Sequence, residues 1–160
     1  MRDAGISSRR EWKAARREVE SKIPKEEAVL AEGPSGFLFS DGQMAMWVEV
    51  HIAVTQRRIV WALPKTRQAG AVTMDLDQVV KYLDRVVPYE GHEFGVVALT
   101  ARDPEYAQLL NDPTNPRGET DAVFKFDDAP SAVSTSIRGA IEQGVLQRGR
   151  AVPGSLSDYL

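Results

Sequence analysis

The sequence contains no cysteine and only two histidines, which excludes several kinds of site at the outset. Without cysteine, the chain has no disulfide, no thiolate metal ligand and no cysteine nucleophile. A zinc site needs three or four protein ligands, and His51 and His92 are far apart, with neither HxH nor HxxxH spacing. We therefore expect no metal site and no cofactor. The lack of cysteine also fits a reducing compartment.

Long apolar runs are missing as well. No run approaches the ~20 apolar residues that span a bilayer, and the first 21 residues have no apolar segment of the kind found in secretory signals. We expect a cytoplasmic protein without a transmembrane segment, whose contact with a membrane would be peripheral at most.

Recognisable catalytic motifs are absent. The sequence has no GxSxG, no P-loop and no GxGxxG after a strand. Neighbouring carboxylates occur at 26–27, at 75 and 77, and at 127–128, where helix capping or the ends of strands explain them better than acid–base catalysis. We predict a protein that is not an enzyme and has no catalytic residues. An enzyme without a recognisable motif remains an alternative.

The composition is that of a soluble globular domain, with 160 residues, 42% hydrophobic and 27% charged. The net charge of −3 is unevenly spread, because residues 1–23 carry seven basic and four acidic side chains and the rest is acidic. A basic head suggests an anionic partner or docking onto the acidic body. We expect no nucleic-acid binding, which needs several phosphate contacts.

The first half of the chain predicts one helix followed by strands. Ser8 and Glu11 form a capping-box pattern, and Pro24 ends the helix expected over 7–23. Glycine and proline interrupt residues 28–42, which indicates short strands there. Further strands are expected, from alternation or apolar runs, at 44–54, 59–63, 71–74, 92–101 and 122–126.

Three segments of the second half complete the outline. Residues 76–87 fit either a helix or a strand that follows one turn of helix, and 109–121 form a long loop. Apolar residues every four positions, at Val133, Ile137, Ile141 and Val145, predict a final helix, capped by Asp128 with Pro130 in its first turn. We divide the chain into a basic helix (1–24), a domain (25–146) and a disordered tail (147–160).

One helix, about seven strands and a final helix predict a mainly β (α+β) fold, an antiparallel barrel capped by its C-terminal helix. The run VTQRRIVW at 54–61 resembles bacterial pleckstrin-homology-like (PH-like, GRAM-type) domains. In these a strand ends in threonine, here Thr55, turns through a polar pair and resumes with arginine and an aliphatic residue, here Arg58 and Ile59. Leu76, Asp77 and Val79 match the element that follows. The resemblance covers about 27–146.

The resemblance implies a module for protein–protein interaction or oligomeric scaffolding. Its alternative implication is peripheral binding of anionic lipid headgroups through the loop cations Arg57, Arg58, Lys65 and Arg67. From the residues themselves, we expect the Thr55 hydroxyl to hydrogen-bond the turn locally. Arg58 should face away from Ile59 and pair with an acidic neighbour.

Overall fold

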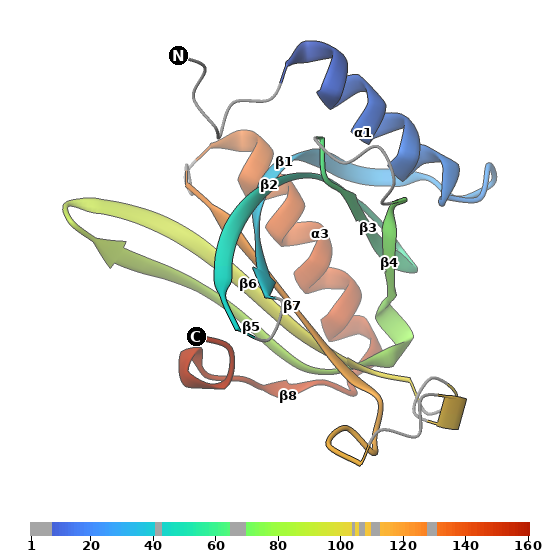
Figure 1. Ribbon diagram of the computed structural model, residues 1–160, viewed down its shortest axis with the longest axis vertical. Helices are drawn as coiled ribbons and strands as arrows, with labels where there is room; N and C mark the ends of the chain where they lie inside the picture. The colour runs from blue at the N-terminus through green and yellow to red at the C-terminus, as the bar shows by residue number, and fades with distance from the viewer. Residues whose placement is uncertain are drawn as a thin grey trace.

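The computed structural model describes residues 8–40, 43–64, 70–103, 105, 108–109, 113–127 and 131–160. The fold is mainly β, as predicted, with eight strands and two long helices within the described part of the chain (Figure 1). The elements are α1 Arg9–Ser21, β1 Val29–Ser40, β2 Ala45–Thr55, β3 Arg58–Ala62, β4 Val72–Asp75, η1 Leu76–Gln78, β5 Val79–Tyr89, β6 His92–Arg102, β7 Glu119–Phe126, α3 Ala132–Arg148, β8 Val152–Pro153 and η2 Leu156–Asp158.

The strands form one sheet in the order β4-β3-β2-β1-β7-β6-β5-β8. Neighbouring strands are antiparallel except β8, which runs parallel to β5. The sheet is open, with β4 at one end and β8 at the other. Its two halves are joined only where Gly36 and Phe37 of β1 pair with Lys125 and Phe124 of β7. We call this junction the seam.

Strand β1 corrects the prediction of short strands over 28–42, because it runs unbroken from Val29 to Ser40. Its glycines allow close approach and do not mark turns. A Cβ on Gly33 would lie 2.6 Å from Cγ1 of Val133 in α3, and one on Gly36 would lie 3.3 Å from the carbonyl oxygen of Lys125. The first distance leaves no room for a Cβ and the second is tight, so glycine at these places lets β1 approach α3 and β7 closely.

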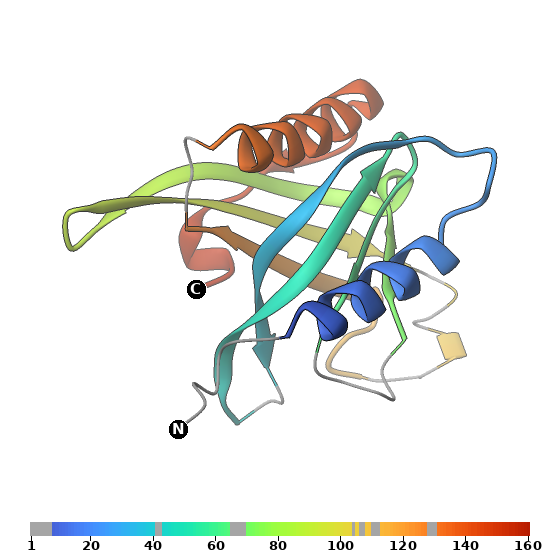
Figure 2. The same ribbon diagram turned by 90° about the horizontal axis from the view of Figure 1, so that it is seen from above.

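Helix α3 lies across the inner face of the sheet and covers the main core (Figure 2). Ile137, Ile141 and Val145 are buried as the spacing predicted, while Val133 is half exposed. Asp128 and Pro130 lie outside the described residues, and the cap observed is Ser131, whose side chain accepts a hydrogen bond from Ser134 N–H. Helix α3 is fixed to β5 by Arg138, whose Nη2 lies 2.7 Å from Oδ1 of Asp84.

Helix α1 packs on the outer face of β2 and β3. The predicted capping box is present, since Ser8 and Glu11 exchange hydrogen bonds of 3.0 and 3.2 Å. Ala15 and Val19 are buried against Ala53, Val60 and Ala62. The face of β2 opposite its valines is therefore buried over its second half, and the described part of the basic head packs on the sheet.

The C-terminal segment differs from the disordered tail that we predicted for 147–160. Helix α3 continues to Arg148 and ends at Gly149, which adopts the left-handed conformation typical of helix C-termini. Strand β8 then pairs with β5, and Leu156 and Tyr159 pack on the outer face of β5–β7. Tyr159 Oη lies 2.9 Å from Oγ1 of Thr100. This segment covers the outer face, which is why it is ordered.

Residues 76–87 form one short 3-10 turn followed by β5, which settles the ambiguity in favour of a strand. Strands β2, β3, β4 and β6 lie where predicted, to within one or two residues, and β7 begins three residues early, at Glu119. Among the described helices, none combines the length and apolar character needed to cross a membrane.

Candidate functional site

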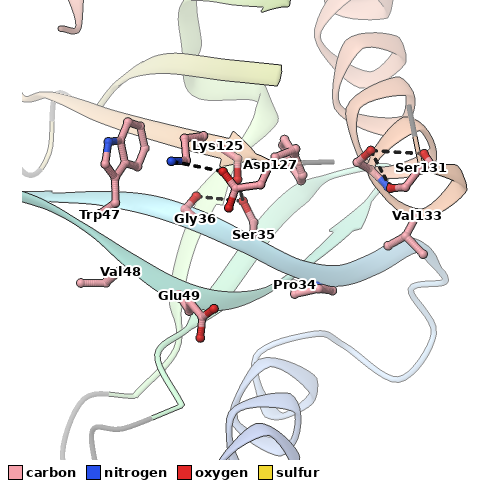
Figure 3. Close-up of a pocket in the computed structure, with 12 residues that line it drawn as sticks. Pro34, Ser35, Gly36, Trp47, Val48, Glu49, Lys125, Asp127, Ser131 and Val133 are labelled. Carbon is pink, nitrogen blue, oxygen red and sulfur yellow. Dashed lines mark hydrogen bonds and ion pairs between the residues drawn. The ribbon is translucent and has the colours of Figure 1, made fainter. Parts of the chain in front are cut away.

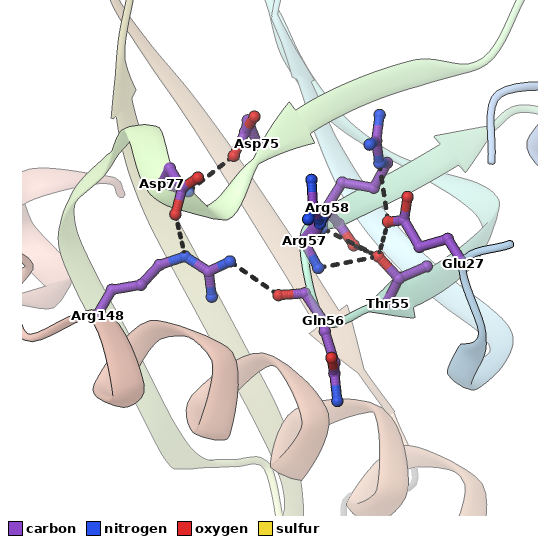
Figure 4. A network of polar contacts seen from close by, with 8 residues as sticks. All are labelled: Glu27, Thr55, Gln56, Arg57, Arg58, Asp75, Asp77 and Arg148. Carbon is purple, nitrogen blue, oxygen red and sulfur yellow. Dashed lines mark hydrogen bonds and ion pairs between the residues drawn. The ribbon is translucent and has the colours of Figure 1, made fainter. Parts of the chain in front are cut away.

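The turn between β2 and β3, where the sequence placed a candidate site, is organised by one hydroxyl. Oγ1 of Thr55 accepts hydrogen bonds from the N–H groups of Arg57 and Arg58, both 3.1 Å away, and donates to Oε1 of Glu27 (Figure 4). Thr55 is fully buried. The threonine thus joins the turn to the segment before β1, and its predicted local role is confirmed.

Arg58 pairs with an acidic neighbour, as expected. Its Nε donates to Oε1 of Glu27 over 2.9 Å, and the Glu27 side chain is only 10% exposed. Burial raises the pKa of Glu27, but the hydrogen bonds from Thr55 and Arg58 and the positive charges of Arg58 and Arg57 outweigh it and hold the pKa below its ordinary value. Arg58 is therefore a structural residue, and its charge is neutralised within the fold.

Arg148, at the end of α3, ties the same turn to η1. Its guanidinium donates to Oδ1 of Asp77 over 2.5 Å and to the carbonyl oxygen of Gln56 over 2.9 Å. The hydrogen bond from Arg148 is the main reason that the pKa of Asp77 is lowered. Four segments distant in sequence meet here: the residues before β1, the β2–β3 turn, η1 and the end of α3.

Of the four cations in the predicted ligand site, the structure describes Arg57 and Arg58. Arg57 is exposed and Arg58 is paired, and the cavity of about 400 Å³ beside them also contains Glu26 and Glu27. Two arginines and two carboxylates balance, so the cavity carries no excess positive charge. Lys65 and Arg67 lie outside the described residues, and their part in this site stays a prediction.

A different surface combines exposed apolar side chains with a cavity. Large apolar side chains at the far end of the β1–β2 hairpin are exposed by 37–64%: Phe39, Met44, Met46 and Trp47. We call this the hairpin end. Phe39 pairs with Met46, and their side chains share a face with Met44. Phe39, Met44 and Met46 thus form an apolar patch on one face of the hairpin, and exposed apolar patches are often functional. Trp47 pairs with Leu38 and lies on the opposite face, where it lines a cavity.

Next to the hairpin end, the seam contains a cavity of about 520 Å³ (Figure 3). Trp47 overlies Gly36, and Nζ of Lys125 lies 5.3 Å from the centre of the Trp47 ring and 5.4 Å from that of Phe94. The same Nζ is 3.2 Å from Oδ1 of Asp127. Pro34, Val48 and Val133 add apolar surface. This arrangement can accept an apolar side chain and hydrogen-bond a polar group at its edge.

His51 is a buried polar residue on β2. Its Nε2 lies 3.3 Å from Oε1 of Glu32 without a hydrogen bond of acceptable geometry, and Nε of Arg16 lies 3.0 Å from the same oxygen. Burial beneath α1 lowers the pKa of His51, more than the neighbouring Glu32 carboxylate raises it. The histidine is therefore a neutral residue at the α1 contact.

Within the described residues, no group of three or more histidine, aspartate or glutamate side chains is placed to hold a metal ion. Sequence reasoning missed the hairpin end because the alternation was used only to place a strand at 44–54, and the exposure of its first residues was not considered. The signal was available in the sequence, because four large apolar residues flank Asp41 and Gly42: Phe39, Met44, Met46 and Trp47. The seam could not be found from the sequence, because it joins β1 to β7.

Comparison with known proteins adds little to this description. No protein-family model matches the chain, and no curated protein matches it. Solved structures that match include a chain described as "Mutations in SsgB correlate to longitudinal cell division during sporulation of Streptomyces coelicolor". That match has 10% identity and a TM-score of 0.32, and it covers 79% of this chain and 90% of the other. Similarity at this level carries no argument about fold or function.

Proposed function

We propose that this protein is a PH-like interaction module of the cytoplasm, without enzymatic activity, that binds a partner protein through the hairpin end and the adjacent seam cavity. The observation that carries the proposal is the concentration of four large, exposed apolar side chains on one hairpin beside a cavity of about 520 Å³. Contiguous apolar surface bordered by polar groups is typical of sites where proteins dock.

The PH-like part of the proposal is supported by the order of elements. Seven antiparallel strands and a C-terminal helix follow one another along the chain, and the helix covers the inner face between β4 and β5. The Thr55 hydroxyl accepts hydrogen bonds from the turn between β2 and β3, at the threonine on which the resemblance rests. Helix α1 and the segment after α3 are additions to this arrangement: α1 covers the outer face of β2 and β3, and Leu156 and Tyr159 cover that of β5–β7.

Charge favours a protein partner over an anionic membrane. The charged residues that line the cavity beside the hairpin end are Glu49, Asp127 and Lys125, and Lys125 is already paired with Asp127. An anionic lipid surface would meet two carboxylates beside the apolar side chains, which is unfavourable for docking. A partner that presents apolar side chains, with a basic group at the edge opposite Glu49, fits these charges.

The test compares what two matched variants bind. Met46→Asp places a charge in the hairpin end, while Val72→Asp makes a similar change on β4, the end strand of the sheet; both positions are about half exposed. We expect the wild type and Val72→Asp to capture the same partner from cell extract, and Met46→Asp to lose it, with both variants folded by circular dichroism.

Equal capture by all three proteins would contradict the proposal. Salt-sensitive co-sedimentation with vesicles that contain phosphatidylserine, but not with neutral vesicles, would also contradict it. That result would favour anionic lipid binding, through Arg57 and the loop at 65–67, over binding of a partner protein.

A further inference from the structure

The outer edge of β5 is the one long strand edge at its end of the sheet. Strand β8 pairs with β5 only at Lys81 and Tyr82, and within the described residues no other strand follows it. Seven residues of β5, from Leu83 to Tyr89, are therefore left with one open side. An unpaired strand edge is a template for pairing with another chain.

The main-chain groups on this edge can be assigned from two observations. The N–H of Gly154 donates to the carbonyl oxygen of Tyr82 over 2.8 Å, so the main chain of Tyr82 points away from β6. Because main-chain groups alternate along a strand, those of Asp84, Val86 and Pro88 also point outward. The pairing of Tyr89 with His92 across a two-residue turn agrees with this assignment.

The β5–β6 hairpin also projects from the body of the molecule, as the yellow-green arm of Figure 1 shows. On the outward end of β5, Arg85 is exposed and Val86 is 43% exposed. A two-stranded hairpin alone in water is marginally stable, which makes an added strand favourable. Pro88 is compatible with an edge, since the N–H that it lacks would point to solvent.

We propose that the occupant of this edge is β5 of a second copy of the chain, in a two-fold symmetric, antiparallel pair centred on Val86. The open segment, Leu83 to Tyr89, has Val86 at its midpoint, so symmetric pairing uses the whole segment. It sets Arg85 opposite Val87 of the second copy. A pair centred one residue earlier would set the two Arg85 side chains opposite each other, where their like charges would repel.

The pairing also satisfies the outward donors. Each Val86 N–H would donate to the Val86 carbonyl of the second copy. Each Asp84 N–H would donate to the Pro88 carbonyl of the second copy, so proline acts only as an acceptor and its missing N–H is not needed. Strand β8 ends the pair at Tyr82, which fixes its register. The buried area is smaller than that of a standard interface, so we expect weak association, with a dissociation constant on the order of 100 micromolar.

Single-cysteine variants of the full chain test this directly, because the natural sequence has no cysteine. Val86→Cys places two thiols opposite each other across the two-fold axis, and Val72→Cys, at an equally exposed valine on the β4 edge, is the control. With a short bis-maleimide, we expect Val86→Cys to form covalent dimer at least about tenfold faster than Val72→Cys.

Sedimentation velocity from about 10 to about 500 micromolar gives an independent readout. We expect the wild type and Val72→Lys to shift towards dimer as concentration rises, and Val86→Lys to remain a monomer. A monomeric wild type throughout, or equal cross-linking of the two cysteine variants, would overturn the proposal. The proposal does not depend on the hairpin end, so Met46→Asp should dimerise like the wild type.

Discussion

Replacing Thr55 by valine tests the polar network that holds the β2–β3 turn. The two side chains have nearly the same shape, and Thr55 is fully buried, so the change removes the hydroxyl without leaving a cavity. What is lost is one bond to the Glu27 carboxylate and two from turn N–H groups. We expect Thr55→Val to lower the free energy of unfolding.

The magnitude follows from these bonds. A hydrogen bond to a charged group contributes about 1.5–3 kcal/mol and a neutral one about 1 kcal/mol, and water can solvate part of the exposed turn. We therefore expect a loss of about 2–4 kcal/mol, a large part of the 5–15 kcal/mol typical of a domain. Urea unfolding at pH 7 measures it.

Two matched variants separate the hydroxyl from the packing. Thr55→Ser keeps the hydroxyl and should lose only about 1 kcal/mol, from its missing methyl group. Thr73→Val makes the same change at an exposed position of β4 and should stay within about 0.5 kcal/mol of the wild type. If Thr55→Val is as stable as Thr73→Val, the argument that this hydroxyl organises the turn is refuted.

Three further predictions concern α3 and the contact of α1 with the sheet. Gly139→Ala should stabilise α3 by about 1 kcal/mol, because its Cβ would meet nothing. Gly144→Ala should instead destabilise by about 1–2 kcal/mol, because its Cβ would lie 2.7 Å from Cδ1 of the buried Leu76; thermal unfolding of both variants checks the contrast. Asp84→Asn should lower the free energy of unfolding by about 2–4 kcal/mol, because it leaves the largely buried Arg138 charge unpaired. Asp77→Asn changes an exposed carboxylate and should lower it by less than about 1 kcal/mol. Equal losses in urea unfolding would contradict this. Burial lowers the pKa of His51, so its contribution to stability is present above the ordinary histidine pKa of about 6.5 and is lost as pH falls below it. The free energy of unfolding should therefore decline from pH 7 towards pH 5.5 in the wild type and in His92→Gln. It should decline less in His51→Gln.

The sequence predicted the elements whose signals are local. The capping box of Ser8 and Glu11, the alternation along β2 and the threonine at the β2–β3 turn all depend on neighbours within a few residues, and each is observed. Residues 28–42 were misread because glycine was taken as a turn signal. Gly33 and Gly36 are instead required by contacts with α3 and β7, which are about 90–100 residues away along the chain.

The candidate site depended even more on distant contacts. Arg57 and Arg58 looked like a ligand-binding pair, but Glu27 neutralises one of them, and that contact spans 31 residues. The tail was expected to be disordered from its composition, yet Leu156 and Tyr159 cover an outer face of the sheet that needs a layer over it. The composition of a segment indicates whether it would fold in isolation. It does not indicate whether the rest of the protein has an apolar surface against which the segment can pack.

The central claim, that the hairpin end binds a partner protein, is tested most directly by hydrogen–deuterium exchange of the chain alone and with the partner captured by the wild type. The account predicts slower exchange in residues 37–48 when the partner is bound, with residues 72–75 of β4 unchanged. Slower exchange confined to the β2–β3 turn around residues 55–58, with the hairpin end unchanged, would contradict it.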